Sequence, residues 1–191
     1  MIYRAHFVLP ITRDPIESGE VLVRDGKIQA IGLDLAASLP DEPVEDLGHA
    51  VILPGLINVH THLDYTIMRN MVENQPFFPW IRRLTELGGR LDYEDWLASA
   101  RLGALQLIRS GVTCIGDSTF SGAVVEAAKE AGLCGTIYLE TFGSDPSAEY
   151  EQQVEALAER VHELNSNAGD RVSVGVSPHS VYTSSEKLLR L

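Results

Sequence analysis

The chain has 191 residues, of which 45% are hydrophobic and 22% are charged, values typical of a soluble globular protein. Its formal net charge of −12 excludes nucleic acid as the main partner, because that binding depends on Lys and Arg neutralising phosphates. No apolar run approaches the roughly 18 residues of a membrane span, and the N-terminus lacks a secretory signal pattern, so we expect a cytoplasmic protein without a membrane partner.

The first 52 residues have the pattern of a small β-sheet. An apolar stretch covers residues 2–9, and GEVLVRDGKIQAIG at residues 19–32 has Asp25-Gly26 as a hairpin turn between two alternating runs. A stretch rich in Pro and acidic residues, 39–46, is predicted to be a surface connection. We place the domain boundary after it, between residues 52 and 53.

Beyond residue 53, strands alternate with helices, which predicts an α/β domain with a parallel sheet. We expect strands at 56–60, 112–116, 135–140 and 172–176, and helices at 93–109, 121–131 and 148–164. The residues TSSE at 183–186 have the form of a capping box that opens a further helix, of which about a turn and a half remains. Four of the eight β/α units of a TIM (β/α)8 barrel are therefore expected in residues 53–191, as a truncated first half.

Two of the six histidines, His60 and His62, lie at the end of the first of these strands. Side chains alternate faces along a strand, so the two imidazoles should point the same way and offer a pair of ligands to a metal such as zinc. The bare His-x-His tripeptide also occurs by chance in loops or as hydrogen-bonded core histidines. The tripeptide by itself leaves both interpretations open.

Polar residues gather at the ends of the predicted strands, where barrel enzymes place their active sites. Asp117, Glu140 and His179 are the candidates there beside the histidine pair, although acidic residues at strand ends also cap helices or bind loop amides. From its spacing, His179 is compatible with a third metal ligand and with a substrate-binding residue. Cys114 and Cys134 are interpreted as inert buried thiols.

These motifs resemble the amidohydrolase superfamily. LPGLINVHTHLD, residues 53–64, is similar to the first-strand signature of that family. VSPHSVYTSS, residues 176–185, is similar to the fourth-strand motif of its chlorohydrolase and deaminase branch, which includes adenosylhomocysteine and methylthioadenosine deaminases. FFPWIRRL and YLETFG also resemble the aminodeoxyfutalosine deaminase-like group. The resemblance implies that residues 1–52 are a β-sandwich portion and that only the N-terminal half of the family's chain is present.

The resemblance further implies a metal-dependent hydrolase of C–N bonds other than peptide bonds, in which metal-activated water deaminates a purine-type or other heterocyclic amine. His60 and His62 would bind one divalent metal ion, expected to be Zn²⁺, and His179 and Glu140 are assigned to substrate binding. The fourth strand has no lysine, which disfavours a bridged two-metal centre. The family's other ligands and its acid/base fall on later strands, so no residue is assigned to catalysis and the chain alone is expected to be inactive.

Two other functions stay open. An incomplete, catalytically inactive half barrel would act as a binding or assembly module, and chlorohydrolase or amide hydrolase chemistry would use the same attack by water. The expected partner is a small heterocyclic substrate, and a homo-oligomer is left open.

Overall fold

The structure, a computed structural model, describes residues 1–191, and it divides into two units, Met1–Gly55 and Leu56–Leu191. The assignment of residues 1–52 and 53–191 to two domains stays a proposal. None of the helices combines the length and the apolar character that a bilayer crossing requires.

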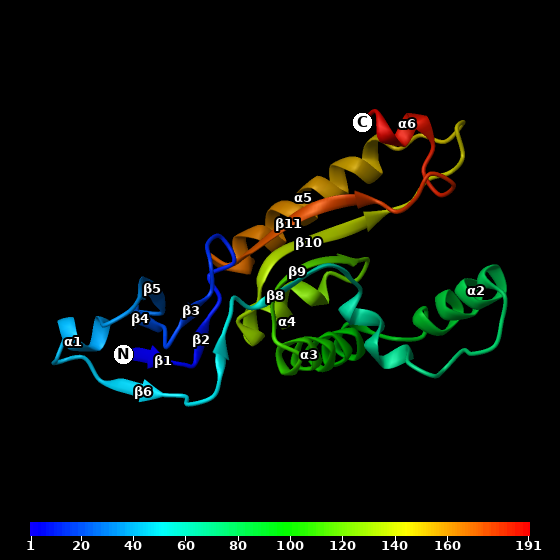
Figure 1. The fold of residues 1–191 in the computed structure, drawn as a ribbon. Coiled ribbons are helices and arrows are strands. Elements are labelled where there is room, and N and C mark those ends of the chain that lie inside the picture. Colours follow the sequence, from blue (N-terminus) through cyan, green and yellow to red (C-terminus); the bar gives the residue numbers. More distant parts are fainter. The chain divides into compact units, whose positions relative to one another are not determined.

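Two small sheets make up the first unit (Figure 1). One has the strand order β5-β4-β1-β6 and the other has the order β3-β2-β7. Their core contains the buried side chains Ile2, Val8 and Leu22. The elements are β1 (Ile2–Arg4), β2 (Phe7–Val8), β3 (Ile16–Glu17), β4 (Glu20–Arg24), β5 (Lys27–Gly32), α1 (Leu35–Ser38), β6 (Val44–Asp46) and β7 (Val51–Ile52).

The predicted hairpin between β4 and β5 is confirmed. Asp25 and Gly26 have φ values of 51° and 70°, and Arg24 pairs with Lys27 across the turn. Positive φ at both central residues is the conformation for which Asp-Gly is favoured. The predicted surface connection at residues 39–46 is wrong in its last part, because β6 pairs there with β1 in parallel. All three β6 side chains are exposed, as an edge strand permits, so the stretch carries no hydrophobic pattern.

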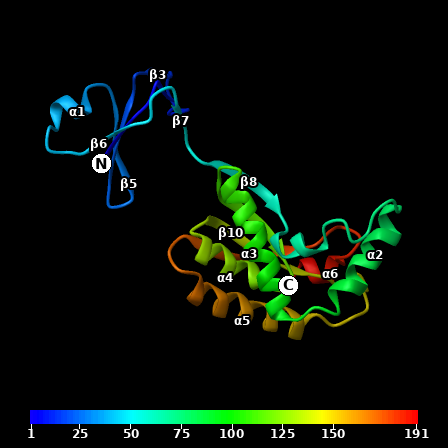
Figure 2. The ribbon, with the colours of Figure 1, turned by 90° about the horizontal axis from the view of Figure 1, so that it is seen from below.

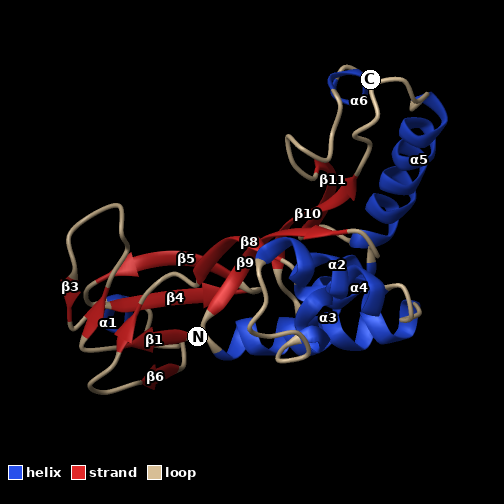
Figure 3. Ribbon diagram, turned by 90° about the vertical axis from the view of Figure 1, so that its right-hand side faces the viewer, coloured by secondary structure: helices blue, strands red, loops and turns tan.

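The second unit is built on four parallel strands in the order β11-β10-β9-β8. In Figure 2 the helices α3, α4 and α5 lie along one face of this sheet, and Figure 3 shows the helices and strands as separate layers. The elements are β8 (Leu56–Thr61), η1 (Leu63–Met68), α2 (Phe77–Gly88), α3 (Tyr93–Arg109), β9 (Val112–Thr119), α4 (Ala123–Ala131), β10 (Cys134–Thr141), α5 (Glu151–Ala168), β11 (Val172–Pro178) and α6 (Glu186–Leu189).

The face of the sheet that packs on the helices forms the main hydrophobic core. Ile115 of β9 and Ile137 and Leu139 of β10 are at most 2% exposed, together with alanines and valines of α3 and α4. The opposite face carries half-exposed residues such as Ser118 and Glu140. β8 and β11 each pair on one side only, and the sheet does not close. This is the predicted α/β arrangement, a first half of a TIM barrel that follows a small β portion in the sequence.

Some element ends and three helices differ from the sequence prediction. The helix at residues 93–109 is confirmed at both ends, whereas β9 runs on to Thr119, so Asp117 and Ser118 lie within the strand instead of after it. The predicted capping box at residues 183–186 is wrong, because Ser185 is the N-cap of α6 and accepts a hydrogen bond from the Leu188 amide. The helices α1, η1 and α2 were not predicted.

Candidate active site at the carboxyl ends of the parallel strands

The two histidines of the His-x-His motif lie close together at the end of β8. Their ring centroids are 5.1 Å apart and the ring planes are nearly perpendicular, at 86°. His60 is exposed and His62 is half-buried. An irregularity in the pairing of β8 with β9 spans the residues between Asn58 and Thr61, His60 included, and the two imidazoles still lie next to each other. Two imidazoles in this arrangement offer nitrogen ligands to one ion.

The neighbouring strand β9 fixes the tautomer of His62. His62 Nδ1 lies 2.7 Å from the carbonyl oxygen of Ser118. A carbonyl oxygen only accepts hydrogen bonds, so Nδ1 carries the proton and Nε2 of the neutral ring keeps its lone pair. Histidines that bind metals commonly donate their other N–H to such an oxygen.

Buried side chains of β9 and of the turn after it hold the segment that follows His62. Asp117 Oδ2 accepts a hydrogen bond from the Leu63 amide at 2.9 Å. Asp64 Oδ2 accepts hydrogen bonds from the hydroxyl groups of Thr119, at 2.6 Å, and Ser121, at 3.1 Å. The aspartates and Thr119 have no exposed surface, and Oδ1 of each aspartate has no hydrogen-bond partner. The segment after His62 is thus bound to β9 through groups shielded from water.

Burial makes these carboxyl groups unusually basic. Burial raises the pKa of Asp117 to about 8, and the charges of Asp64 and Glu140 act in the same direction. Burial also raises the pKa of Asp64, against the hydrogen bonds from Thr119 and Ser121. A carboxyl group removed from water favours its neutral form, so Asp117 is largely protonated at neutral pH.

Glu140, near the end of β10, is a half-buried carboxyl group among histidines. Burial raises its pKa, and the nearby rings of His62, His179 and His60 oppose that shift. Burial thus favours the neutral form of this carboxyl group more than in an exposed glutamate, and a carboxyl group with a perturbed pKa is a common feature of functional sites.

His179 follows the last residue of β11. Its Nδ1 lies 3.0 Å from Thr183 Oγ1, and its backbone amide donates to the carbonyl oxygen of Thr141 at 3.1 Å. Its ring lies 4.8 Å from the ring of Phe142, with an angle of 32° between the planes. These contacts orient an exposed imidazole, and the structure does not bring it into contact with His60 or His62.

Three of the four predicted site residues line one hollow of about 1090 Å³; they are His62, Glu140 and His179. Its walls are mainly apolar and come from η1, from α2 and from the loops after β9 and β10. Such a shape, with a few polar groups on an apolar wall, suits a small organic ligand. The wall residues are Tyr65, Met68, Val72, Phe77, Trp80, Ile81, Leu84, Phe120 and Phe142, with Arg69, Asn70 and Glu73 as further polar members.

The sequence analysis missed the wall that α2 contributes. Trp80, Ile81 and Leu84 recur at helical spacing after Pro76, and Pro79 stands in the first turn of the helix. Proline is tolerated in a first helical turn, so this spacing was the available signal. The role of Asp64 was missed as well. For Asp117 the structure favours the structural interpretation, since its carboxyl group binds a loop amide.

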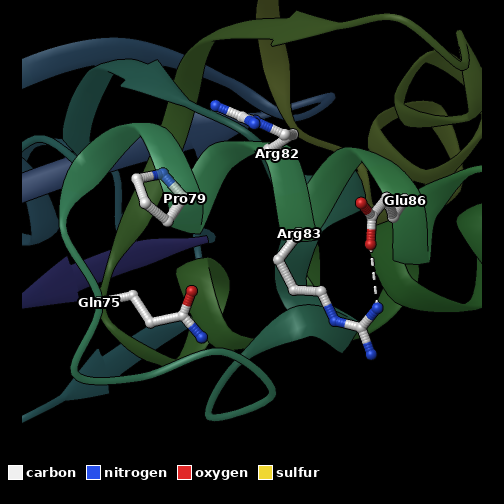
Figure 4. Close-up of a pocket in the computed structure, with 5 residues that line it drawn as sticks. All are labelled: Gln75, Pro79, Arg82, Arg83 and Glu86. Atoms are coloured by element: carbon white, nitrogen blue, oxygen red, sulfur yellow. Dashed lines mark hydrogen bonds and ion pairs between the residues drawn. The ribbon is translucent and has the colours of Figure 1, made fainter.

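A second hollow, of about 290 Å³, lies on the outer side of α2 and contains none of the predicted site residues. Figure 4 shows its lining side chains, among which Arg83 is bonded to Glu86 at 3.0 Å. The other lining residues are Gln75, Pro79 and Arg82. It is shallow and its only ion pair is exposed, so we place the candidate site at the larger hollow.

No group of three or more His, Cys, Asp or Glu side chains that could hold a metal ion occurs in the structure. The two histidines at the end of β8 form a pair only, and they stay the metal ligands predicted from the sequence. The orientation of His62, with Nε2 left free, fits a divalent ion there.

Comparison with known proteins gives a consistent relationship. The sequence model of the amidohydrolase family matches residues 51–191. The chain is 32% identical to 5'-deoxyadenosine deaminase of Methanothrix thermoacetophila over 172 residues, which are 89% of this chain and 40% of the relative. It is 34% identical to 5-methylthioadenosine/S-adenosylhomocysteine deaminase of Desulforamulus reducens over 173 residues, 88% of this chain and 39% of the relative. The chain thus spans about two fifths of the length of these relatives.

Solved structures show the same fold. Helicobacter pylori aminofutalosine deaminase in complex with methylthio-coformycin superposes with a TM-score of 0.83 at 23% identity, over 98% of this chain and 46% of that one. Guanine deaminase of C. acetobutylicum with bound guanine also gives a TM-score of 0.83, at 16% identity, over 98% of this chain and 48% of that one. The predicted half barrel and the predicted family resemblance, limited to the N-terminal half, are confirmed.

Proposed function

The chain belongs to the amidohydrolase family, and we propose that it supplies the first half of the active site of a metal-dependent hydrolase of C–N bonds. The proposed reaction is the deamination of a purine-type or other heterocyclic amine. One observation carries the proposal: His62, Glu140 and His179 come from three different strand ends and line one hollow of about 1090 Å³. The names of the relatives, deaminases of adenosine-type compounds, support this substrate class.

His60 and His62 would hold the divalent ion, which we expect to be Zn²⁺. When bound, such an ion supplies a water molecule of lowered pKa for attack on the substrate. The chain's own contribution is the orientation of the ligands, because the hydrogen bond from His62 Nδ1 to the Ser118 carbonyl leaves Nε2 free to bind.

Glu140 and His179 would bind the heterocycle between them. Glu140 is a half-buried carboxyl group with a raised pKa, so it can either accept from a ring N–H or donate to a ring nitrogen. His179 would donate a hydrogen bond to the substrate or to its leaving group. The apolar wall that includes Trp80 and Phe142 would exclude water from the flat faces of the substrate.

Zinc binding by the 191-residue chain tests the metal assignment. We expect one Zn²⁺ site in calorimetric titration or equilibrium dialysis, with an affinity that falls at least about tenfold in His60→Ala and in His62→Ala, because each loses one of two nitrogen ligands. A matched control exists, since His6 and His49 form another exposed pair with ring centroids 5.4 Å apart. The double variant His6→Ala/His49→Ala should keep the site. Zinc binding that depends on His6 and His49 alone would contradict the assignment.

The role of His179 is tested by kinetics in a complete form of the enzyme. His179→Ala should keep its metal content and lower kcat/KM, as expected for a residue that contacts the substrate. Metal loss equal to that of His62→Ala would instead make His179 a ligand.

Products and turnover separate this proposal from its alternatives. Ammonia release from adenosine-type substrates indicates deamination, whereas release of chloride or cleavage of amides indicates the other hydrolase chemistries. We expect no turnover by the 191-residue chain alone, because β8 and β11 leave the sheet open on both edges. A complete form that neither binds metal nor turns over any of these substrates would act as a binding or assembly module.

A further inference from the structure

The ring of His179 has two neighbours, and each of them restricts a different property of the ring. The ring of Phe142 lies 4.8 Å away, with 32° between the planes, and this contact restricts the plane of the imidazole. Rotation by 180° about the Cβ–Cγ bond leaves that plane unchanged, and the χ2 preference of histidine is broad and roughly two-fold. The aromatic contact alone therefore does not decide which edge of the imidazole faces the hollow.

The hydroxyl group of Thr183 distinguishes the two edges. Its Oγ1 lies 3.0 Å from Nδ1 of His179. Of the two ring nitrogens, only Nδ1 is bonded within the chain, which leaves Nε2 available to a ligand. Both residues line the hollow of about 1090 Å³, so the free nitrogen belongs to the candidate site.

The backbone of Thr183 is tied to the loop after β10. The Gly143 amide donates to the carbonyl oxygen of Thr183 at 2.7 Å, and the Ser185 amide donates to the carbonyl oxygen of Gly143 at 2.6 Å. A Cβ atom at position 143 would lie 2.4 Å from Cε1 of Tyr150, so this close approach requires glycine. Threonine is also stiff at χ1 because it is β-branched. The hydroxyl group is thus held in place before any ligand enters.

Ser180 adds a third polar group to this contact. Its Oγ lies 2.7 Å from Thr183 Oγ1. Its carbonyl oxygen lies farther from the same atom, at 3.3 Å, and already accepts from the Thr183 amide at 3.2 Å. A hydroxyl group has only one proton to donate. The direction of these hydrogen bonds therefore depends on which nitrogen of His179 carries the proton.

We propose that Thr183 is a positioning residue for His179, an inference that rests on the proposed function, in which His179 donates to the substrate. A neutral imidazole that donates from Nε2 accepts at Nδ1, so Thr183 donates its proton to Nδ1. Ser180 Oγ then donates to Thr183 Oγ1, whose only proton is already used. The hydrogen bonds run from Ser180 through Thr183 to His179, and they present Nε2–H as the donor to the substrate or to its leaving group.

The position of the ring proton is tested in the 191-residue chain by nitrogen NMR of isotopically labelled histidine rings. The signals of His179 are those that His179→Ala removes. We expect the proton on Nε2. Thr183→Val should change the Nδ1 chemical shift, because it removes the donor, and Thr183→Ser should restore it. The control Thr136→Val removes a similar hydroxyl contact, with Ser173 at 3.0 Å near the other ends of β10 and β11, and should leave these signals unchanged.

Kinetics in a complete form of the enzyme test whether Thr183 acts through His179. Thr183→Val should lower kcat/KM by about two- to tenfold, the effect of one hydrogen bond between neutral groups, and Thr183→Ser should restore it. Ser180→Ala should lower kcat/KM less, because Thr183 can still donate to Nδ1. In the His179→Ala background, Thr183→Val should have no further effect, because the group that Thr183 positions is gone.

Three results would overturn the proposal. They are a proton on Nδ1 in the wild-type chain, identical His179 ring signals in the wild-type chain and Thr183→Val, and independent losses of kcat/KM that add in the double variant. The first reverses the hydrogen bonds, the second excludes the bond to Nδ1, and the third makes Thr183 a separate contact of the substrate. Absence of turnover in the complete enzyme would refute the proposed function instead, and the NMR measurement would still decide whether Thr183 donates to Nδ1.

Discussion

Asp117 should make the stability of this protein fall as the pH rises from 5 to 7. Its pKa is raised to about 8 by burial, whereas an aspartate in an unfolded chain has a pKa near 3.9. Between these values the folded state holds a proton that the unfolded state has released, so unfolding releases a proton and is favoured by higher pH. A difference of one bound proton lowers the free energy of unfolding by about 1.4 kcal/mol for each pH unit, which is about 2–3 kcal/mol between pH 5 and 7.

The variant Asp117→Asn isolates this contribution. The side-chain oxygen of asparagine can still accept from the Leu63 amide, as Asp117 Oδ2 does at 2.9 Å, while the titrating group is removed. Urea unfolding at pH 5, 6 and 7 should show a flatter pH dependence for the variant than for the wild-type chain. Asp170→Asn, at an exposed loop position, removes the same charge and should leave the wild-type slope. Equal slopes for Asp117→Asn and the wild-type chain would refute the reasoning.

Two further changes test the packing around the site. Thr119→Val should lower the free energy of unfolding, measured in urea, by about 1–3 kcal/mol, because it removes the 2.6 Å hydrogen bond to the buried Asp64. Thr119→Ser keeps the hydroxyl group and should keep most of this free energy. Gly103→Ala should destabilise despite a helix-propensity gain of about 1 kcal/mol, because the new Cβ would lie 2.5 Å from Thr66 Oγ1 and overpacking costs about 1–3 kcal/mol. The control Gly89→Ala meets nothing closer than 3.6 Å, and an unchanged melting temperature in Gly103→Ala would contradict the packing argument.

The fold was predictable where local signals coincide with tertiary packing. The helix at residues 93–109 has a capping box of Asp92 and Asp95 at its start and Gly111, with a φ of 83°, just beyond its end. The extension of β9 to Thr119 was not predictable in the same way. Its last residues are polar, and only the buried hydrogen bonds to the segment after His62 reveal why they continue a strand.

The candidate site also has one part that local sequence signals predict and another part that depends on tertiary packing. Period two along one strand is a local property, and it was enough to predict that His60 and His62 lie on the same side. The wall of the hollow depends on where α2 lies, and Trp80 and Leu84 acquire a role only through that placement. A single sequence likewise does not show which residue of another strand a side chain contacts. The sequence analysis therefore includes Asp64 only as the last residue of a motif.

The organisation of β9 shows which part of the chain sets the geometry of the histidine pair. Ser118 accepts from the His62 ring, its neighbour Asp117 accepts from the Leu63 amide, and Thr119 donates to Asp64. Three successive residues of β9 thus bind the three successive residues that follow β8. The side chains of Asp117 and Thr119, which make two of these contacts, have no exposed surface. Hydrogen bonds in such surroundings are costly to break, because the freed groups cannot turn to solvent. The orientation of the proposed metal ligand is therefore imposed by β9, and substitutions on that strand should change zinc affinity without contact with the ion.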